Sequence, residues 1–315
     1  MLSLASALLI NPPWAAPGSD PSKLSLVALF DAETAYVDLA MGDGIAVGAR
    51  TDGRIDVLGP GFGYVTETFE VGSEPLTSVA LSEVAGEAVA VVGSAGSARV
   101  IELDGGTELC EIKASGHFTE LATGTSGGRP VVVSGGSGGF GVWDVGDCVS
   151  HGRFAAEGGS NVGILTADGS AAAVFGVGSG VTRAYHLSTG IATGNRISLT
   201  GLPTLATTAH GDLVTALGPR LSTWDTVTGS EKIGVDLGSS VRDGSLAVLR
   251  AGERLLAATV DAEGTLRVCD LDSGGEVGEY QFGLSESPPL LGFSGDGDPL
   301  LVAATAGRVS VFRLP

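Results

Sequence analysis

The chain has 315 residues, of which 43% are hydrophobic and 17% charged, a composition that excludes intrinsic disorder and requires a packed core. A net charge of −19, with no cluster of Arg or Lys, argues against nucleic acid and anionic membranes as partners. Glycine is unusually frequent, at 51 residues without a Gly-X-Y period, and predicts many short strands separated by tight turns.

Residues 1–23 are predicted to form an N-terminal arm. They include an apolar run, Leu2 to Ile10, which is too short to span a bilayer and has no Lys or Arg before it. Because a secretory signal normally begins with positive charge, we expect the arm to pack on the domain, and secretion is the alternative. The next segment, LSLVALF (24–30), has the composition of a strand.

A repeat of about 42 residues organises the rest of the chain. Its clearest copies include PRLSTWDTVTGSEKIGVDL (219–237) and GTLRVCDLDSGGEVGEYQF (264–282). Weaker copies at 53–71 and 307–315 complete a set of seven. Alignment of the copies places these residues in register: Val57, Glu102, Asp144, His186, Asp225, Asp270 and Arg313.

Each copy follows two short apolar runs, such as LTSVAL (76–81) and AVAVVG (88–93). One repeat is therefore four strands, which at this period make one blade of a β-propeller. We expect an all-β, seven-bladed β-propeller with four-stranded antiparallel blades, formed as a single domain by residues 24–315. The last copy ends at Pro315 after its third strand, so we predict that the strand at 24–30 completes this blade and closes the ring.

Trp143-Asp144 and Trp224-Asp225 end two predicted third strands, and Gly116-His117 precedes the third blade. In these residues the chain resembles the bacterial WD-repeat β-propeller superfamily. The resemblance implies a hydrogen-bonded tie within a blade, formed by a His, a Ser or Thr, and a Trp. His117, Ser134 and Trp143 match those positions in the third blade. Only two blades keep Trp-Asp, so the resemblance specifies neither subfamily nor partner.

No arrangement of residues predicts catalysis. The four histidines have no Asp or Ser at a spacing that would build a triad, and the two G-x-S-x-G patterns (124–128 and 135–139) are not followed by a helix. Close carboxylates are explained by turns, which favour Asp. We therefore expect a non-catalytic protein without a metal site or cofactor.

The three cysteines, Cys110, Cys148 and Cys269, are widely spaced and include no C-x-x-C pair. This spacing predicts neither a disulfide framework nor a zinc site. We expect three buried free thiols and a cytoplasmic protein.

The resemblance also implies that one face of the disc binds partners. That face is formed by the loops from second to third strands and from fourth strands to the next blade. On this chain we expect those loops to carry an excess of acidic residues over three arginines, Arg50, Arg220 and Arg242. The nine acidic residues are Asp31, Glu33, Asp52, Glu74, Glu157, Asp243, Asp261, Glu263 and Glu286. We predict a scaffold or sensing module whose acidic face binds a basic or amphipathic protein segment. The simpler explanation is that turns favour Asp throughout an acidic protein.

The alternative is a propeller hydrolase, similar to a lactonase, with a central metal. Such an enzyme needs carboxylates or histidines converging at the inner ends of the blades. The predicted first strands are mostly small or apolar, and Asp38 and Glu120 are the main exceptions. A cation bound at either residue would favour the enzyme.

Overall fold

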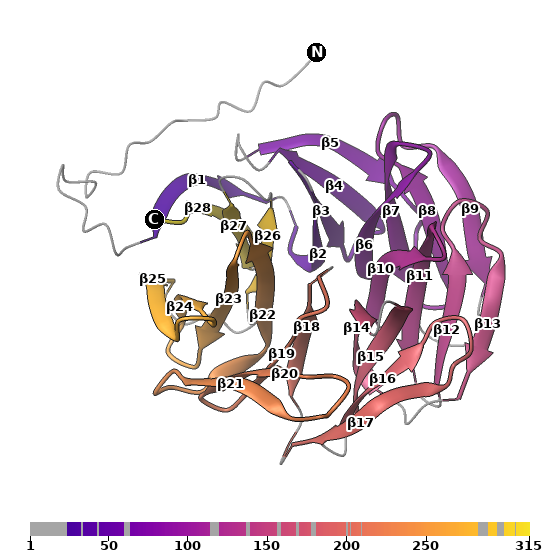
Figure 1. Ribbon diagram of the computed structural model, residues 1–315. Coiled ribbons are helices and arrows are strands. Elements are labelled where there is room, and N and C mark those ends of the chain that lie inside the picture. The colour runs from indigo at the N-terminus through magenta and orange to yellow at the C-terminus, as the bar shows by residue number, and fades with distance from the viewer. Residues whose placement is uncertain are drawn as a thin grey trace.

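The computed structural model describes residues 24–315 except for 33, 43, 60–63, 114–119, 137–138, 156–158, 168–169, 178–180, 200, 202, 209, 283–288, 295–298 and 306. The described residues form seven four-stranded antiparallel sheets, which Figure 1 shows arranged around a common axis. This confirms the predicted all-β, seven-bladed β-propeller. Within the described part of the chain, no helix is long and apolar enough to cross a membrane.

The strands of each blade follow one another from the central channel outward. Blade one contains β2 (Tyr36–Gly42), β3 (Ile45–Arg50), β4 (Arg54–Gly59) and β5 (Tyr64–Glu70), and blade two contains β6 (Leu76–Val84), β7 (Glu87–Ser94), β8 (Ser97–Glu102) and β9 (Glu108–Lys113). Blade three contains β10 (Glu120–Ser126), β11 (Arg129–Gly136), β12 (Gly139–Asp144) and β13 (Ser150–Phe154). Blade four contains β14 (Gly159–Ala167), β15 (Ser170–Val177), β16 (Val181–His186) and β17 (Ala192–Ser198).

The remaining blades follow the same order. Blade five contains β18 (Thr204–Thr207), β19 (Leu213–Leu217), β20 (Arg220–Trp224) and β21 (Glu231–Asp236). Blade six contains β22 (Val241–Ala251), β23 (Arg254–Asp261), β24 (Thr265–Asp270) and β25 (Gly275–Gln281). Blade seven contains β26 (Leu290–Ser294), β27 (Leu300–Thr305), β28 (Arg308–Arg313) and β1 (Ser25–Asp31).

The core lies between blades. The middle strands, such as β3 and β23, are buried at nearly every residue because a neighbouring sheet covers each of their faces. The outer strand β1 instead alternates exposed and half-buried residues. Seven separate clusters of buried hydrophobic side chains fill the seven interfaces between adjacent blades. The first strands contact one another in a complete circle, from β2 through β26 and back to β2.

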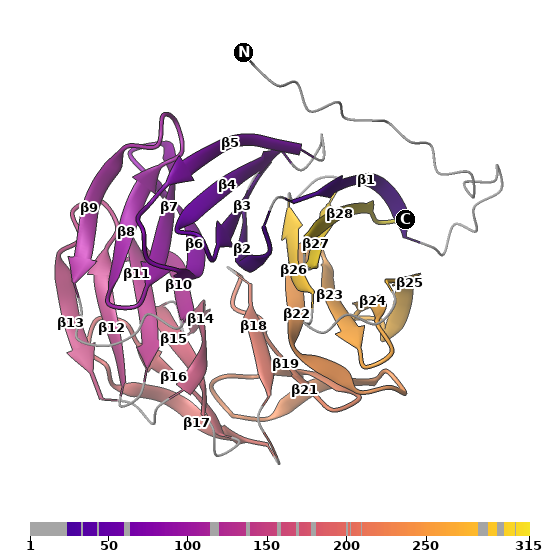
Figure 2. The ribbon, with the colours of Figure 1, turned by 180° about the vertical axis from the view of Figure 1, so that it is seen from behind.

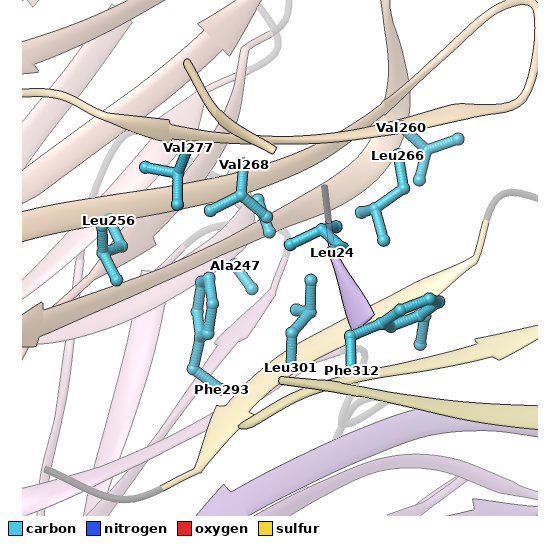
Figure 3. Close-up of a cluster of buried hydrophobic side chains, with 12 residues drawn as sticks. Leu24, Ala247, Leu256, Val260, Leu266, Val268, Val277, Phe293, Leu301 and Phe312 are labelled. Carbon is cyan, nitrogen blue, oxygen red and sulfur yellow. The ribbon is translucent and has the colours of Figure 1, made fainter. Parts of the chain in front are cut away.

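The N-terminal strand closes the ring, as predicted. β1 pairs antiparallel with β28, from Ser25 opposite Arg313 to Asp31 opposite Arg308, and both views show the two strands side by side (Figures 1 and 2). Leu24, just before β1, is 6% exposed and lies between Leu266 and Phe312 in the cluster that joins blades six and seven (Figure 3). The two ends of the described chain therefore share one sheet and one core.

The expectation of three free thiols is wrong. Cys110 on β9 and Cys148 in the turn between β12 and β13 form a disulfide, and only Cys269 is free. The two bonded cysteines are 38 residues apart in sequence but belong to neighbouring blades, and their Cα atoms are 5.9 Å apart. The spacing did not predict this pair because the ring, not the local sequence, brings the two residues together.

Candidate functional site

Two sets of loops form one face of the disc, which we call the rim face: those joining second to third strands and those joining fourth strands to the next blade. Backbone hydrogen bonds connect the two sets. The amide of Ala32 donates to the carbonyl of Gly307 at 3.0 Å, that of Val71 to Gly53 at 2.9 Å, and that of Phe282 to Gly264 at 3.0 Å. These hydrogen bonds hold the described rim loops of blades one, six and seven together. The loops joining first to second and third to fourth strands form the opposite face, which we call the turn face.

The structure describes six of the nine predicted rim carboxylates. Asp31, Asp52, Glu74, Asp243 and Glu263 are exposed. Glu33, Glu157 and Glu286 lie outside the described residues. The sixth, Asp261, is 3% exposed, so burial removes it from the surface that a partner could touch.

Asp261 shapes the loop between β23 and β24. Its Oδ1 accepts hydrogen bonds from the amides of Glu263 at 3.1 Å and Thr265 at 2.8 Å, and its Oδ2 accepts one from the Ser239 hydroxyl at 2.9 Å. Burial opposes its ionisation, but the hydrogen bonds from Thr265 and Ser239 outweigh burial and lower the pKa of Asp261. This carboxylate stabilises the loop that presents Glu263.

Arginines neutralise two of the exposed rim carboxylates. The buried Arg50 forms an ion pair with Asp52 at 2.7 Å, and Arg308 lies 3.5 Å from Asp31. Glu74, Asp243 and Glu263 have no cation within ion-pair distance among the described residues. These three side chains are therefore the predicted rim carboxylates that are both exposed and without an ion-pair partner among the described residues.

The predicted tie within the third blade is described in part. His117 lies outside the described residues. Ser134 is buried, and its hydroxyl donates to the carbonyl of Gly135 at 3.4 Å. Trp143 is also buried, and its indole covers Gly141 so closely that a Cβ there would collide with the ring.

The fifth blade contains a tie that the sequence interpretation missed. The indole Nε1–H of Trp224 donates to the hydroxyl of Thr215 at 2.8 Å. Thr215 is paired with Ser222, two residues before Trp224, just as Ser134 is paired with Gly141, two residues before Trp143. The common spacing from the hydroxyl residue to the Trp was the signal that could have identified Thr215.

The channel carboxylates Asp38 and Glu120 tie adjacent blades together. Asp38 on β2 accepts hydrogen bonds from the amides of Leu39 and, in the next blade, Val79, both at 2.8 Å. Glu120 on β10 accepts one from Val162 in the next blade at 2.6 Å. The described residues include no group of three or more His, Cys, Asp or Glu placed to hold a metal ion.

Burial in the channel alters the titration of both groups. It raises the pKa of Glu120 to about 8, opposed by the Val162 hydrogen bond and assisted by the nearby negative charge of Asp38. Burial also raises the pKa of Asp38, although the amides of Val79 and Leu39 oppose it. Burial in the channel therefore makes the charged form of both side chains less favourable than it is in water.

No protein-family model matches the chain, and no curated protein is significantly similar to it. The fold defines the class of the protein, a seven-bladed β-propeller closed by its N-terminal strand.

We expect Thr215→Val to lower the free energy of unfolding by about 1–2 kcal/mol, because it leaves the Trp224 indole N–H without its acceptor. The matched control is Thr223→Val. The Thr223 hydroxyl is buried and has no hydrogen-bond partner among the described residues, so its replacement should be neutral or stabilising. Denaturant unfolding of both variants provides the measurement. Equal decreases in the free energy of unfolding of the two variants would show that the Thr215–Trp224 hydrogen bond itself does not stabilise the protein.

We expect Glu120→Gln to stabilise the protein in alkaline solution. The pKa of Glu120 is about 8 in the folded protein, against 4.5 for an ordinary Glu. The stabilising contribution of the protonated form is therefore fully present below about pH 4.5 and is lost as the pH rises through about 8. Glutamine stays neutral, so the variant should exceed the wild type by about 2–4 kcal/mol at pH 9 and match it within about 1 kcal/mol at pH 5.

Denaturant unfolding at the two pH values measures this difference. The control, Glu87→Gln, removes an exposed carboxylate from the turn face. If Glu120→Gln changed the free energy of unfolding by the same amount at both pH values, the result would contradict a raised pKa for Glu120.

Proposed function

We propose that this protein is a WD-repeat-type interaction module whose rim face binds a basic or amphipathic segment of a partner protein. The observation that carries the proposal is the set of three exposed rim carboxylates that form no ion pair among the described residues, Glu74, Asp243 and Glu263. The Trp224–Thr215 bond supports the WD-repeat relationship, because it repeats the Trp and hydroxyl geometry that this resemblance implies.

The charge of the rim face favours a cationic partner. The side chain of Arg50 is 6% exposed and is used by Asp52 and Asp56, so it contributes little positive potential outside the protein. Arg99 donates to the carbonyl of Val71 and pairs with Glu108 at 3.7 Å. Arg50 and Arg99 are therefore engaged within the blades. Of the other rim arginines, Arg220 pairs with Glu231 at 2.8 Å and Arg242 is half-buried, whereas the three carboxylates are exposed. Such an arrangement steers a basic segment toward the face and opposes an acidic one.

The ordered rim loops of blade six support binding in a second way. Asp243 lies on β22, and Glu263 lies in the loop that Asp261 stabilises. The amide of Ala262 donates to the carbonyl of Ser240 at 3.1 Å, which connects these two segments. A surface that is already ordered loses little conformational entropy when a partner binds.

The test compares two triple variants that raise the net charge by the same three units. The rim variant is Glu74→Gln, Asp243→Asn and Glu263→Gln. The control variant is Glu87→Gln, Asp104→Asn and Glu253→Gln, which alters three exposed carboxylates of the turn face. Fluorescence anisotropy measures binding of synthetic Lys/Arg-rich amphipathic peptides at low and high salt.

We expect the rim variant to weaken peptide binding by about five- to tenfold at low salt, and the control variant by less than about twofold. The difference should shrink at high salt, because exposed charges are screened. Equal losses in both variants would assign the attraction to net charge and contradict the rim face as the binding surface. Affinity capture from the native lysate with the same variants then identifies the physiological partner.

A further inference from the structure

The disulfide joins two blades at a position that is distinctive within the repeat. Cys110 lies on β9, the outer strand of blade two, and Cys148 lies in the turn between the third and fourth strands of blade three. Both side chains are partly buried against the cluster that joins these blades. A covalent bond therefore supplements the hydrophobic contact at this interface.

The turn containing Cys148 recurs in five blades with one backbone geometry. In each, an amide donates to the carbonyl four residues earlier: Gly106 to Glu102, Cys148 to Asp144, Gly190 to His186, Gly229 to Asp225, and Gly274 to Asp270. The donor residue has positive φ in every case, with values of 71° for Gly106, 58° for Cys148, 66° for Gly190, 69° for Gly229 and 71° for Gly274. Four blades thus use glycine, and blade three uses cysteine.

A side chain at this position is unfavourable in itself. The left-handed backbone region brings the Cβ of an L-residue close to its own carbonyl oxygen, and glycine avoids this contact. Cys148 therefore destabilises its turn relative to the glycine used elsewhere in the repeat. The bond to Cys110 is the compensating interaction that the structure offers.

We infer that Cys110 and Cys148 form a redox clamp between blades two and three, and that the protein functions with this clamp closed. Closure transfers two electrons to an external disulfide: the two protein thiols become one disulfide, and the external disulfide becomes two thiols. Oxidised glutathione supplies this chemistry in a test, and dithiothreitol reverses it. A clamp that stays closed places the working protein where disulfides persist, unlike the reducing cytosol that free thiols had suggested.

Cys269 does not compete in this exchange. It lies on β24 in blade six, and it is 3% exposed. Burial raises the pKa of its thiol to about 11, with a further increase from Glu276, so little thiolate forms at neutral pH. Exchange is therefore confined to the pair formed by Cys110 and Cys148.

The experiment compares the wild type with Cys148→Gly, Cys110→Ser and Cys269→Ser by thermal unfolding, in oxidised glutathione and in dithiothreitol. Under oxidising conditions we expect the wild type to have a Tm about 5 °C or more above that of Cys148→Gly, because the disulfide constrains the unfolded chain. In dithiothreitol we expect the Tm of Cys148→Gly to exceed that of the wild type by about 1–2 °C, because glycine adopts the positive φ of this turn without strain. Cys110→Ser should melt alike in both buffers, and Cys269→Ser should follow the wild type.

A wild type that melts alike in both buffers, or that stays above Cys148→Gly in dithiothreitol, would overturn the clamp. The redox state of the three cysteines in the cell is determined by acid quenching and alkylation of the protein from its native source, followed by mass spectrometry. Modification at Cys269 alone supports a clamp that is closed in function. Modification at all three cysteines would overturn it.

Discussion

Every blade of this protein has two apolar faces, and this constraint determines the rest of the structure. The middle strands are buried on both sides, so each sheet needs a neighbour on its left and on its right. Seven hydrophobic clusters fill seven interfaces only if the ring is complete. Without β1, the last blade would lack its outer strand and the cover that Leu24 gives to the cluster with blade six. Closure thus stabilises both the last sheet and the circle of cores.

Ring closure also explains the properties of the two surfaces considered for function. At blades one, six and seven, backbone hydrogen bonds join the described rim loops, so a partner would meet ordered loops there. In the channel, the carboxylates of Asp38 and Glu120 are used to join adjacent blades through the amides of Val79 and Val162. Their burial follows from the convergence of seven first strands, and it raises the pKa of both side chains. The interaction proposal therefore rests on the outer carboxylates.

Much of the fold could be predicted because the repeat is a local property of the sequence. Strand length, turn residues and the period of the Trp-Asp positions sufficed for the seven blades, and the surplus strand at 24–30 indicated the closure. The site was less predictable. Asp261 and Glu263 both occur in one acidic loop, yet the first turns inward to accept loop amides while the second stays in solvent. The partnership of Cys110 and Cys148 depends on which blades are neighbours at the periphery, and spacing alone does not encode it.

The contribution of β1 to the free energy of unfolding tests most directly whether ring closure stabilises the propeller. Leu24 directly precedes β1 and is 6% exposed in the core, whereas Leu29 lies within β1 and is 51% exposed. If β1 completes the ring, denaturant unfolding should show a loss of about 2–4 kcal/mol for Leu24→Ala and a change within about 0.5 kcal/mol for Leu29→Ala. Equally small effects from both substitutions would mean that the N-terminal strand does not stabilise the propeller, and would contradict the account.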